Sequence, residues 1–152
     1  MSLHYEVVFS CSLDDETPPE VLDALRWHLG MRDELPAVLE AGNHPYPLLS
    51  PDPDSYLPGG DVASLRRQRV GFTAAGDVFQ WGLHSRNYWL DDDLGELVTI
   101  LDLIAPHVVE DGYGGHFREV HDTDLTVFEF RDGSYVRDRH PERRSWRVSV
   151  RC

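Results

Sequence analysis

One stretch of the chain, residues 78–90, carries polar side chains at a spacing that can bring them together for chemistry. His84, Arg86 and Tyr88 stand two residues apart, and large apolar residues occupy the alternate positions before them. Because a β-strand turns successive side chains to opposite faces, the polar set and the apolar set should separate. An imidazole, a guanidinium and a phenol on one face can bind a small anion. They can also transfer a proton through histidine while arginine stabilises negative charge.

A second strand-like stretch, residues 112–121, repeats the pairing with His116 and Arg118. The predicted ligand-binding set therefore combines both stretches: His84, Arg86, Tyr88, His116 and Arg118. Further candidates on neighbouring strands are Glu6, Thr73 and Arg147. The alternative is that these side chains only decorate a solvent-facing sheet, where each pair contributes a few tenths of a kcal/mol. No catalytic residue is assigned.

Several kinds of chemistry find no support in the residue types. All 14 basic residues are arginine, which excludes Schiff-base chemistry and a phosphate-loop lysine. The eight histidines include no pair at helical i, i+4 spacing and no HxH pair on a strand, so no metal site or cofactor is predicted. The glycine-rich residues 112–115 precede a strand, whereas phosphate-binding glycine loops lead into a helix; a turn with a close backbone approach is expected instead.

The charge of the chain narrows the classes of partner. A formal net charge of −13 repels nucleic-acid phosphates and anionic lipids, so neither nucleic acid nor a membrane is expected as a partner. A basic protein would be steered towards such a surface, although acidity can also serve solubility alone. No apolar run reaches 18 residues, and the start of the sequence lacks a signal-peptide pattern, which favours a cytoplasmic monomer or homodimer.

The first third of the sequence predicts a strand followed by a helix. Residues 4–12 alternate as a strand does, with apolar side chains at every second position. Thr17 and Glu20 have the spacing of a capping box, and Pro18 would occupy the first helical position. The apolar stripe that follows ends at Gly30, a typical residue just after a helix.

Residues 31–68 break this regularity. Six prolines and three glycines fall in this range, and only residues 33–40 have a composition that predicts a short helix. A connection of this length is uncommon in a compact domain. We expect an irregular insert, for which a lid over a pocket, structural packing and a dimer contact all remain open.

Regular elements resume in the second half of the chain. Strands are predicted over residues 70–74 and 78–90 around a Gly-Asp turn, and a helix from an N-cap at Asp93 to the residue before Pro106. The Asp132-Gly133 pair is a strong hairpin signal between two later strands. The strands predicted in the last third span residues 112–121, 125–131, 134–137 and 145–151.

These elements predict a single α+β domain over residues 1–152. Its β-α-β-β-α-β order resembles the ferredoxin-like topology, as a two-layer sandwich with the long Pro-rich insert after the first helix and two or three extra C-terminal antiparallel strands. Two helices cannot cover both faces of such a sheet, so one face should stay open. The predicted function is a soluble acidic accessory or binding domain that holds a small ligand or a basic protein partner on this face. The alternative is a small-molecule enzyme of the dimeric ferredoxin-like type, with a histidine acid/base and an arginine that binds an anion.

Overall fold

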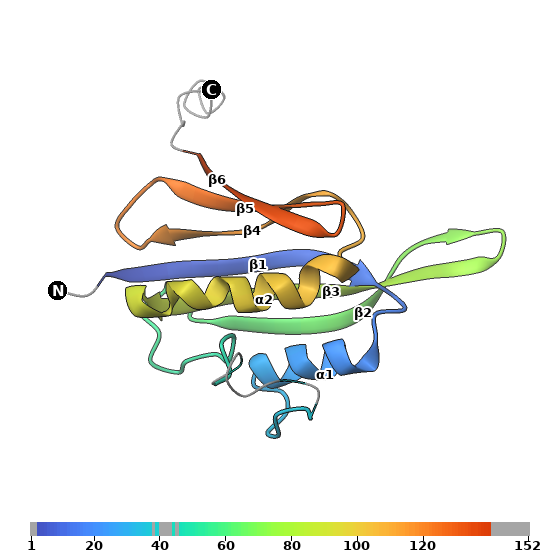
Figure 1. Cartoon of the computed structure of the whole chain (residues 1–152), viewed down its shortest axis with the longest axis horizontal. Helices are drawn as coiled ribbons and strands as arrows, with labels where there is room; N and C mark the ends of the chain where they lie inside the picture. The colour runs from blue at the N-terminus through green and yellow to red at the C-terminus, as the bar shows by residue number, and fades with distance from the viewer. Residues whose placement is uncertain (1–2, 38, 40–43, 45, 141–152) are drawn as a thin grey trace.

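A single antiparallel sheet of six strands forms the body of the protein (Figure 1). The computed structural model describes residues 3–37, 39, 44 and 46–140. The strands lie in the order β2-β3-β1-β4-β5-β6. In chain order the elements are β1 (His4–Asp14), α1 (Pro19–His28), β2 (Val62–Thr73), β3 (Gly76–Leu90), the 3-10 helix η1 (Asp91–Glu96), α2 (Leu97–Ile104), the 3-10 helix η2 (Ala105–His107), β4 (Gly112–Glu119), β5 (Leu125–Arg131) and β6 (Ser134–His140). The mixed α+β class predicted from the sequence is confirmed.

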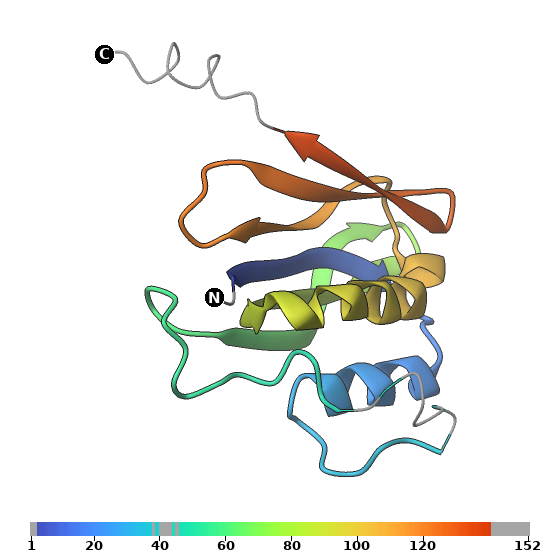
Figure 2. The same ribbon diagram turned by 60° about the vertical axis from the view of Figure 1, so that its left-hand side comes forward.

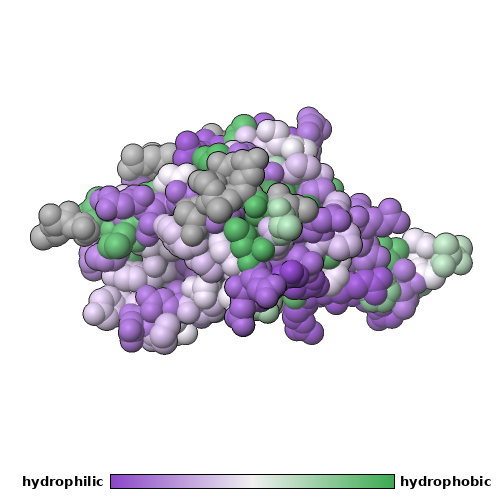
Figure 3. Space-filling model, turned by 60° about the horizontal axis from the view of Figure 1, so that its bottom comes forward, coloured by the Kyte–Doolittle hydropathy of each residue, from purple (hydrophilic) through white to green (hydrophobic). Residues whose placement is uncertain are grey.

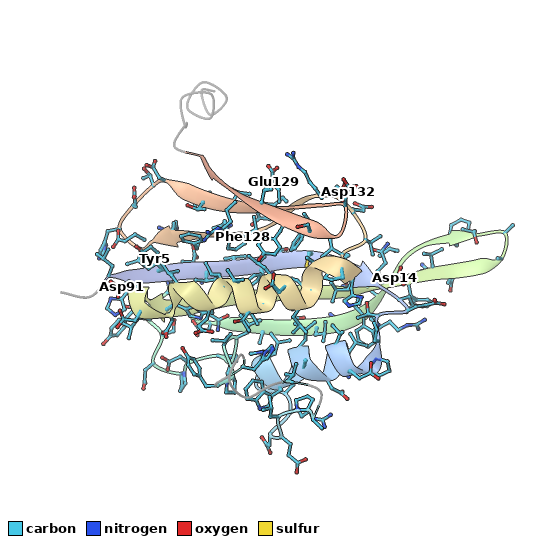
Figure 4. All side chains as sticks on the ribbon, in the orientation of Figure 1. Tyr5, Asp14, Asp91, Phe128, Glu129 and Asp132 are labelled. Atoms are coloured by element: carbon cyan, nitrogen blue, oxygen red, sulfur yellow. The ribbon has the colours of Figure 1, made fainter. Side chains whose placement is uncertain are left out.

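Both helices lie on the same side of the sheet (Figures 1 and 2). The side chains of Val7 and Phe9 in β1 point towards them and are fully buried. The apolar stripes of α1 and α2 complete this core with Phe128 and Phe130 of β5. Phe128 is labelled in Figure 4. Burial of apolar surface at about 25 cal/mol per Å² therefore holds one face of the sheet against the helices and leaves the other face available.

The β2–β3 hairpin is longer than the sequence predicted. Strand β2 begins at Val62 rather than at residue 70, so seven residues expected in the irregular insert, 62–68, belong to the sheet. This stretch is an edge strand with mostly exposed or half-buried side chains, and its run of arginines hides the alternation that marks a half-buried strand. The hairpin projects beyond the rest of the sheet in Figure 1.

The predicted capping box of α1 does not form. Pro18 adopts an extended conformation with φ −54° and ψ 140°, and the helix begins at Pro19. The cause is local, because a residue that precedes proline is disfavoured in the α region, and Pro18 precedes Pro19. Thr17 is thereby displaced from the capping position, and its hydroxyl donates instead to the backbone oxygen of Asp14.

The second helix also begins later than predicted. Asp93 lies within the 3-10 helix η1, and regular α-helix begins at Leu97 without a side-chain cap. Gly95 weakens α-helix formation in this turn. The carboxylate of Asp93 accepts a hydrogen bond from Tyr46 Oη at 2.6 Å and is therefore not used as a cap.

The C-terminal strands follow the sequence prediction closely. Strand β5 has the predicted bounds, and Asp132 and Gly133 both adopt positive φ, as the two central residues of a tight hairpin turn require. Strand β4 ends at Glu119, two residues early, and β6 extends to His140. The strand predicted over residues 145–151 lies outside the described residues. None of the described helices is long and apolar enough to cross a membrane.

The segment between α1 and β2 (residues 29–61) is called the connecting segment, and its described residues pack against the domain without regular structure. Its described residues form turns and bends, and the helix predicted over residues 33–40 is absent from the described part of that range. A helix of that length gains little without a buried apolar face, and Pro36 limits its hydrogen bonds. Leu48 and Leu49 are buried in the main core and anchor this connecting segment.

His28, at the end of α1, fixes the connecting segment by hydrogen bonds. Its Nδ1 accepts from the Leu48 backbone N–H at 3.1 Å, and its backbone oxygen accepts from Leu49 at 2.9 Å. Since Nδ1 is an acceptor, Nε2 carries the proton and donates to His44 Nδ1 at 2.9 Å. Burial, with a smaller contribution from His44, lowers the pKa of His28 to about 3, so the imidazole stays neutral in the folded state.

This buried imidazole predicts a loss of stability in mild acid. The unfolded state takes up a proton near the usual pKa of 6.5, whereas the folded state resists protonation until about pH 3. The contribution of the neutral imidazole to the free energy of unfolding is complete above pH 6.5, and it is lost as the pH falls towards about 3. In His28→Asn, the side-chain oxygen can accept the same hydrogen bond without titrating. We therefore expect the unfolding free energy of this variant to fall by about 2 kcal/mol less than that of the wild type between about pH 7 and about pH 5.

Urea denaturation followed by tryptophan fluorescence at the two pH values measures this difference. His121→Asn, which replaces an exposed histidine, is the matched control and should retain the wild-type pH dependence. Equal pH dependence of wild type and His28→Asn would show that the buried imidazole does not couple stability to protonation.

Candidate functional site

The face of the sheet opposite the helices carries a continuous set of polar side chains. Register places Glu6 of β1 between Tyr88 of β3 and Arg118 of β4, and Val8 between Arg86 and His116. All five residues of the predicted ligand-binding set thus share this open face: His84, Arg86, Tyr88, His116 and Arg118. Their common orientation agrees with the alternation in the sequence. Their role in binding a ligand stays a prediction.

Glu6 is the centre of one half of this face. Its carboxylate is only 10% exposed and accepts from Arg86 Nε at 2.7 Å and from Arg118 Nε at 2.9 Å. Burial raises the pKa of Glu6, but the hydrogen bonds and charges of the two arginines outweigh burial and hold the pKa below its usual value. Glu6 therefore remains ionised and ties the three central strands together.

The two arginines are occupied by the protein itself. Arg86 Nη1 donates to the backbone oxygens of Pro58 and Gly60, and Arg118 Nη1 donates to those of Val120 and Asp122. These bonds anchor two loops to the open face. A guanidinium with such partners holds structure, which favours the structural alternative for both arginines over an exposed anion clamp.

A β-bulge brings a further residue, Tyr113, to this face. The extra residue Gly114 shifts the pairing of β4 with β5 between Tyr113 and Gly115. A Cβ atom on Gly114 would meet the ring of Phe130 at 1.9 Å, and one on Gly115 would meet the Val8 backbone oxygen at 2.1 Å. The expected close backbone approach is present, but within a strand rather than in a turn.

The bulge places Tyr113 and His116 side by side. Tyr113 Oη lies 2.7 Å from His116 Nδ1, and His116 Nε2 lies 3.8 Å from Glu6 Oε1. Burial lowers the pKa of His116 more than Glu6 raises it, so the imidazole is neutral near pH 7. Burial and the charge of Glu6 raise the pKa of Tyr113. Tyr113 and His116 are therefore a neutral hydrogen-bonded pair. They lie at the edge of the cluster formed by Glu6, Arg86 and Arg118, called the Glu6 cluster below.

A depression of about 520 Å³ occupies the other half of the open face. Its volume lies in the range of small-molecule sites, although its lining is more polar than usual. Polar residues line most of it: Ser10 and Ser12 of β1, Ser64 and Gln68 of β2, His84 of β3, and Glu110, Asp111 and Tyr113 at and before the start of β4. Among the described residues that line it there are two carboxylates and no arginine.

His84 is the predicted residue that lines this depression. Its side chain is exposed, and strand pairing places it between Ser10 of β1 and Ser64 of β2. Cys11 also lines the depression, but burial raises the pKa of its thiol to about 12. The thiol therefore stays protonated and is a poor nucleophile.

The remaining predicted residues lie elsewhere. Tyr88 stacks on His4 with ring centroids 4.8 Å apart and meets Tyr56 of the connecting segment edge to face. Thr73 hydrogen-bonds within the turn of the β2–β3 hairpin. Arg147 lies outside the described residues. His84 thus lines the depression, whereas Arg86 and Arg118 on the same face bond to Glu6 and do not line it.

Several lining residues escaped prediction from the sequence. Glu110, Asp111 and Tyr113 come from the stretch that enters β4, and only the fold brings them beside β1 and β3. In the described part of the chain, no group of three or more histidine, cysteine or acidic side chains is arranged to hold a metal ion. Comparison with protein families, curated proteins and solved structures finds no match for this chain.

The Glu6 cluster should make the stability of the protein sensitive to a single substitution, Glu6→Gln. In Glu6→Gln, two mostly buried guanidiniums lose their shared counter-charge, so we expect a loss of about 2 kcal/mol of unfolding free energy near neutral pH. The loss should shrink as the pH falls below 4.5, because protonation then removes the same charge from the wild type.

Chemical denaturation measures both effects. Glu129→Gln on the same face is the matched control, since its partner Arg131 is 63% exposed and such a pair contributes little. A change in Glu6→Gln no larger than in this control would mean that the cluster is not important for stability.

Proposed function

We propose that the chain is a binding domain and that the depression on its open sheet face receives a basic group of a small ligand or of a protein partner. The observation that carries this proposal is the lining. Glu110 and Asp111 supply negative charge, and three serines, Gln68 and His84 supply hydrogen-bonding groups, with no lining cation to oppose a positive ligand. A ligand with several hydrogen-bonding groups and a positive charge fits such a surface best.

The charge of the whole chain supports the same class of partner. A net charge of −13 raises the encounter rate with a basic partner and disfavours anionic ones. The side of the molecule that carries α1, shown in Figure 3, is mostly hydrophilic with small hydrophobic patches. Nucleic acid and membranes are not proposed as partners.

We also propose that the first four strands and two helices form a ferredoxin-like unit. The order β2-β3-β1-β4 and the antiparallel pairing of these strands support this topology. The connecting segment, residues 29–61, would then be an insertion after the first helix. Strands β5 and β6 would be an extension at the β4 edge.

A second candidate function is a small-molecule enzyme with His84 as acid/base. The position of His84 between Ser10 and Ser64 in the depression favours it. The arginine anion clamp predicted with it finds less support, because Arg86 does not line the depression and donates to Glu6 and to the connecting segment. Binding without turnover therefore remains the leading proposal.

The binding proposal predicts a charge-dependent partner. Wild type used as bait in a native lysate should retain a basic protein or a cationic small molecule, identified by mass spectrometry. The double variant Glu110→Gln/Asp111→Asn should lose at least tenfold in retention. Retention by the wild type should fall at about 1 M salt, where the Debye length is about 3 Å.

Asp33→Asn/Glu34→Gln is the control, since it removes two exposed carboxylates from outside the depression. Equal retention by all three proteins, or retention that salt does not weaken, would refute the proposed role of the depression.

The enzyme candidate makes a different prediction. In His84→Gln, turnover of any substrate found among the retained molecules should fall at least a hundredfold, as expected for loss of a general acid/base, with the melting temperature unchanged. His121→Gln should keep wild-type turnover. Mass spectrometry of the product measures turnover. Unchanged turnover in His84→Gln would show that His84 is not a catalytic residue.

A further inference from the structure

A second, smaller cavity lies on the helix-covered side of the sheet, beneath the connecting segment. It measures about 140 Å³ and is formed by residues 46–52 of the connecting segment, Asp61, the end of β3 and Asp93 of η1. Its position differs from that of the open-face depression, and the two share no lining residue. Exposed Pro47 and Asp52 place its mouth at the surface.

Two residues that line this cavity, Asp61 and Asn87, each have a buried side-chain oxygen without a hydrogen-bond donor among the described residues. Asn87 is 2% exposed, and its Nδ2 donates to the Ser50 backbone oxygen at 3.3 Å, which leaves Oδ1 without a partner. Asp61 Oδ2 accepts from the Asp52 backbone N–H at 2.9 Å, whereas Oδ1 is buried and unpaired. A buried acceptor without a donor costs about 1–3 kcal/mol, and more when it is charged.

Both atoms are acceptors, and they lie on neighbouring chain segments. Val62 pairs with Arg86, so Asp61 and Asn87 are next to each other across the start of the β2–β3 ladder. Ser85 Oγ, the other buried polar side-chain atom without a partner among the described residues, does not line the cavity. What the cavity lacks is therefore a donor placed between a carboxylate and an amide oxygen.

The charge around Asp61 Oδ1 and Asn87 Oδ1 indicates that the missing donor is positively charged. In the described part of the chain, three carboxylates line the cavity, those of Asp52, Asp61 and Asp93, and no lining residue is basic. Asp93 Oδ1 accepts from Tyr46 Oη at 2.6 Å, and Asp52 Oδ1 accepts from the Asp54 backbone N–H at 2.8 Å. These bonds are to neutral donors, so the negative charge of the cavity is uncompensated.

We propose that this cavity binds a primary ammonium group through Asp61 Oδ1 and Asn87 Oδ1. An ammonium carries three donors and a positive charge in a volume that the cavity can hold, and the ring of Trp89 in its wall suits the alkyl carbon. Calcium would need six to eight oxygen ligands, and magnesium an octahedron of them, whereas the described lining residues offer only two buried oxygens without a partner. The amine can be a small free molecule or the lysine end of another protein.

Titration with methylammonium chloride, followed by NMR, tests the site directly. The Asn87 side-chain amide and the Trp89 indole N–H, which donates to Leu48 O in the cavity wall, are the reporters. We expect both signals to shift saturably, and tetramethylammonium, which has no N–H donor, to shift neither. N-acetyl-lysine amide distinguishes the sources, because tighter binding than methylammonium indicates a lysine side chain and weaker binding a small free amine.

Asp61→Asn provides the decisive variant. The amide keeps an oxygen that can accept from Asp52 N–H but removes the charge, so affinity for methylammonium should fall at least tenfold. Without amine its melting temperature should stay equal or rise, because the orphaned carboxylate is gone. Asp77→Asn, on the β2–β3 hairpin, is the equal-charge control and should bind as the wild type does.

Three outcomes would overturn the proposal. The first is no saturable shift with methylammonium, which would leave buried water as the partner of both oxygens. The second is a shift by calcium or magnesium chloride at lower concentration than by methylammonium. The third is a lowered melting temperature of Asp61→Asn together with wild-type affinity, which would make the carboxylate a structural group.

Discussion

The buried carboxylate of Glu6 is the constraint on which the open face of this protein depends. A carboxylate at this depth is stable only with charged donors around it, and the arginines of β3 and β4 supply them. Each guanidinium then reaches beyond the sheet to backbone oxygens of a loop, at Pro58 and Gly60 on one side and at Val120 and Asp122 on the other. One ionised group in β1 thus sets the position of two strands and two connections.

The two faces of the sheet consequently have different physical characters. The helix side is held by burial of apolar side chains, which is non-directional and tolerant of small shifts. The open side is held by directed hydrogen bonds between charged groups, which fix side-chain positions more narrowly. A rigid polar face beside a hydroxyl-lined depression suits recognition, since little conformational entropy is lost when a ligand binds to groups that are already ordered.

The sequence predicted features that arise from local patterns. Alternation in β3 gives the common face of His84, Arg86 and Tyr88, and the Asp-Gly pair gives the final hairpin, because each depends on neighbouring residues alone. The register of β1 with β3 and β4 is a different matter. This register brings Arg86 next to Glu6, and no local pattern in the sequence predicts the register.

The errors also have local physical causes. The Pro18-Pro19 step moves the helix start, and an exposed edge strand such as β2 has no buried face to mark its beginning. The bulge at Gly114 reverses the face on which Tyr113 lies, so counting alternate residues from His116 misplaces it. Such a bulge is visible only once Phe130 and Val8 are seen to fill the space beside the two glycines. Asp61 and Asn87 are likewise far apart in sequence, and they come close because Asp61 directly precedes Val62, the residue that pairs with Arg86.

The central place of β1 has a consequence for how the chain acquires its structure. Strand β1 lies inside the sheet, and its partners come much later in the sequence, β3 from Gly76 and β4 from Gly112. On the ribosome β1 therefore emerges with both edges unpaired and waits until residues 76–119 have been made. Such long-range pairing slows folding. An apolar strand with two unpaired edges is prone to aggregation during that interval.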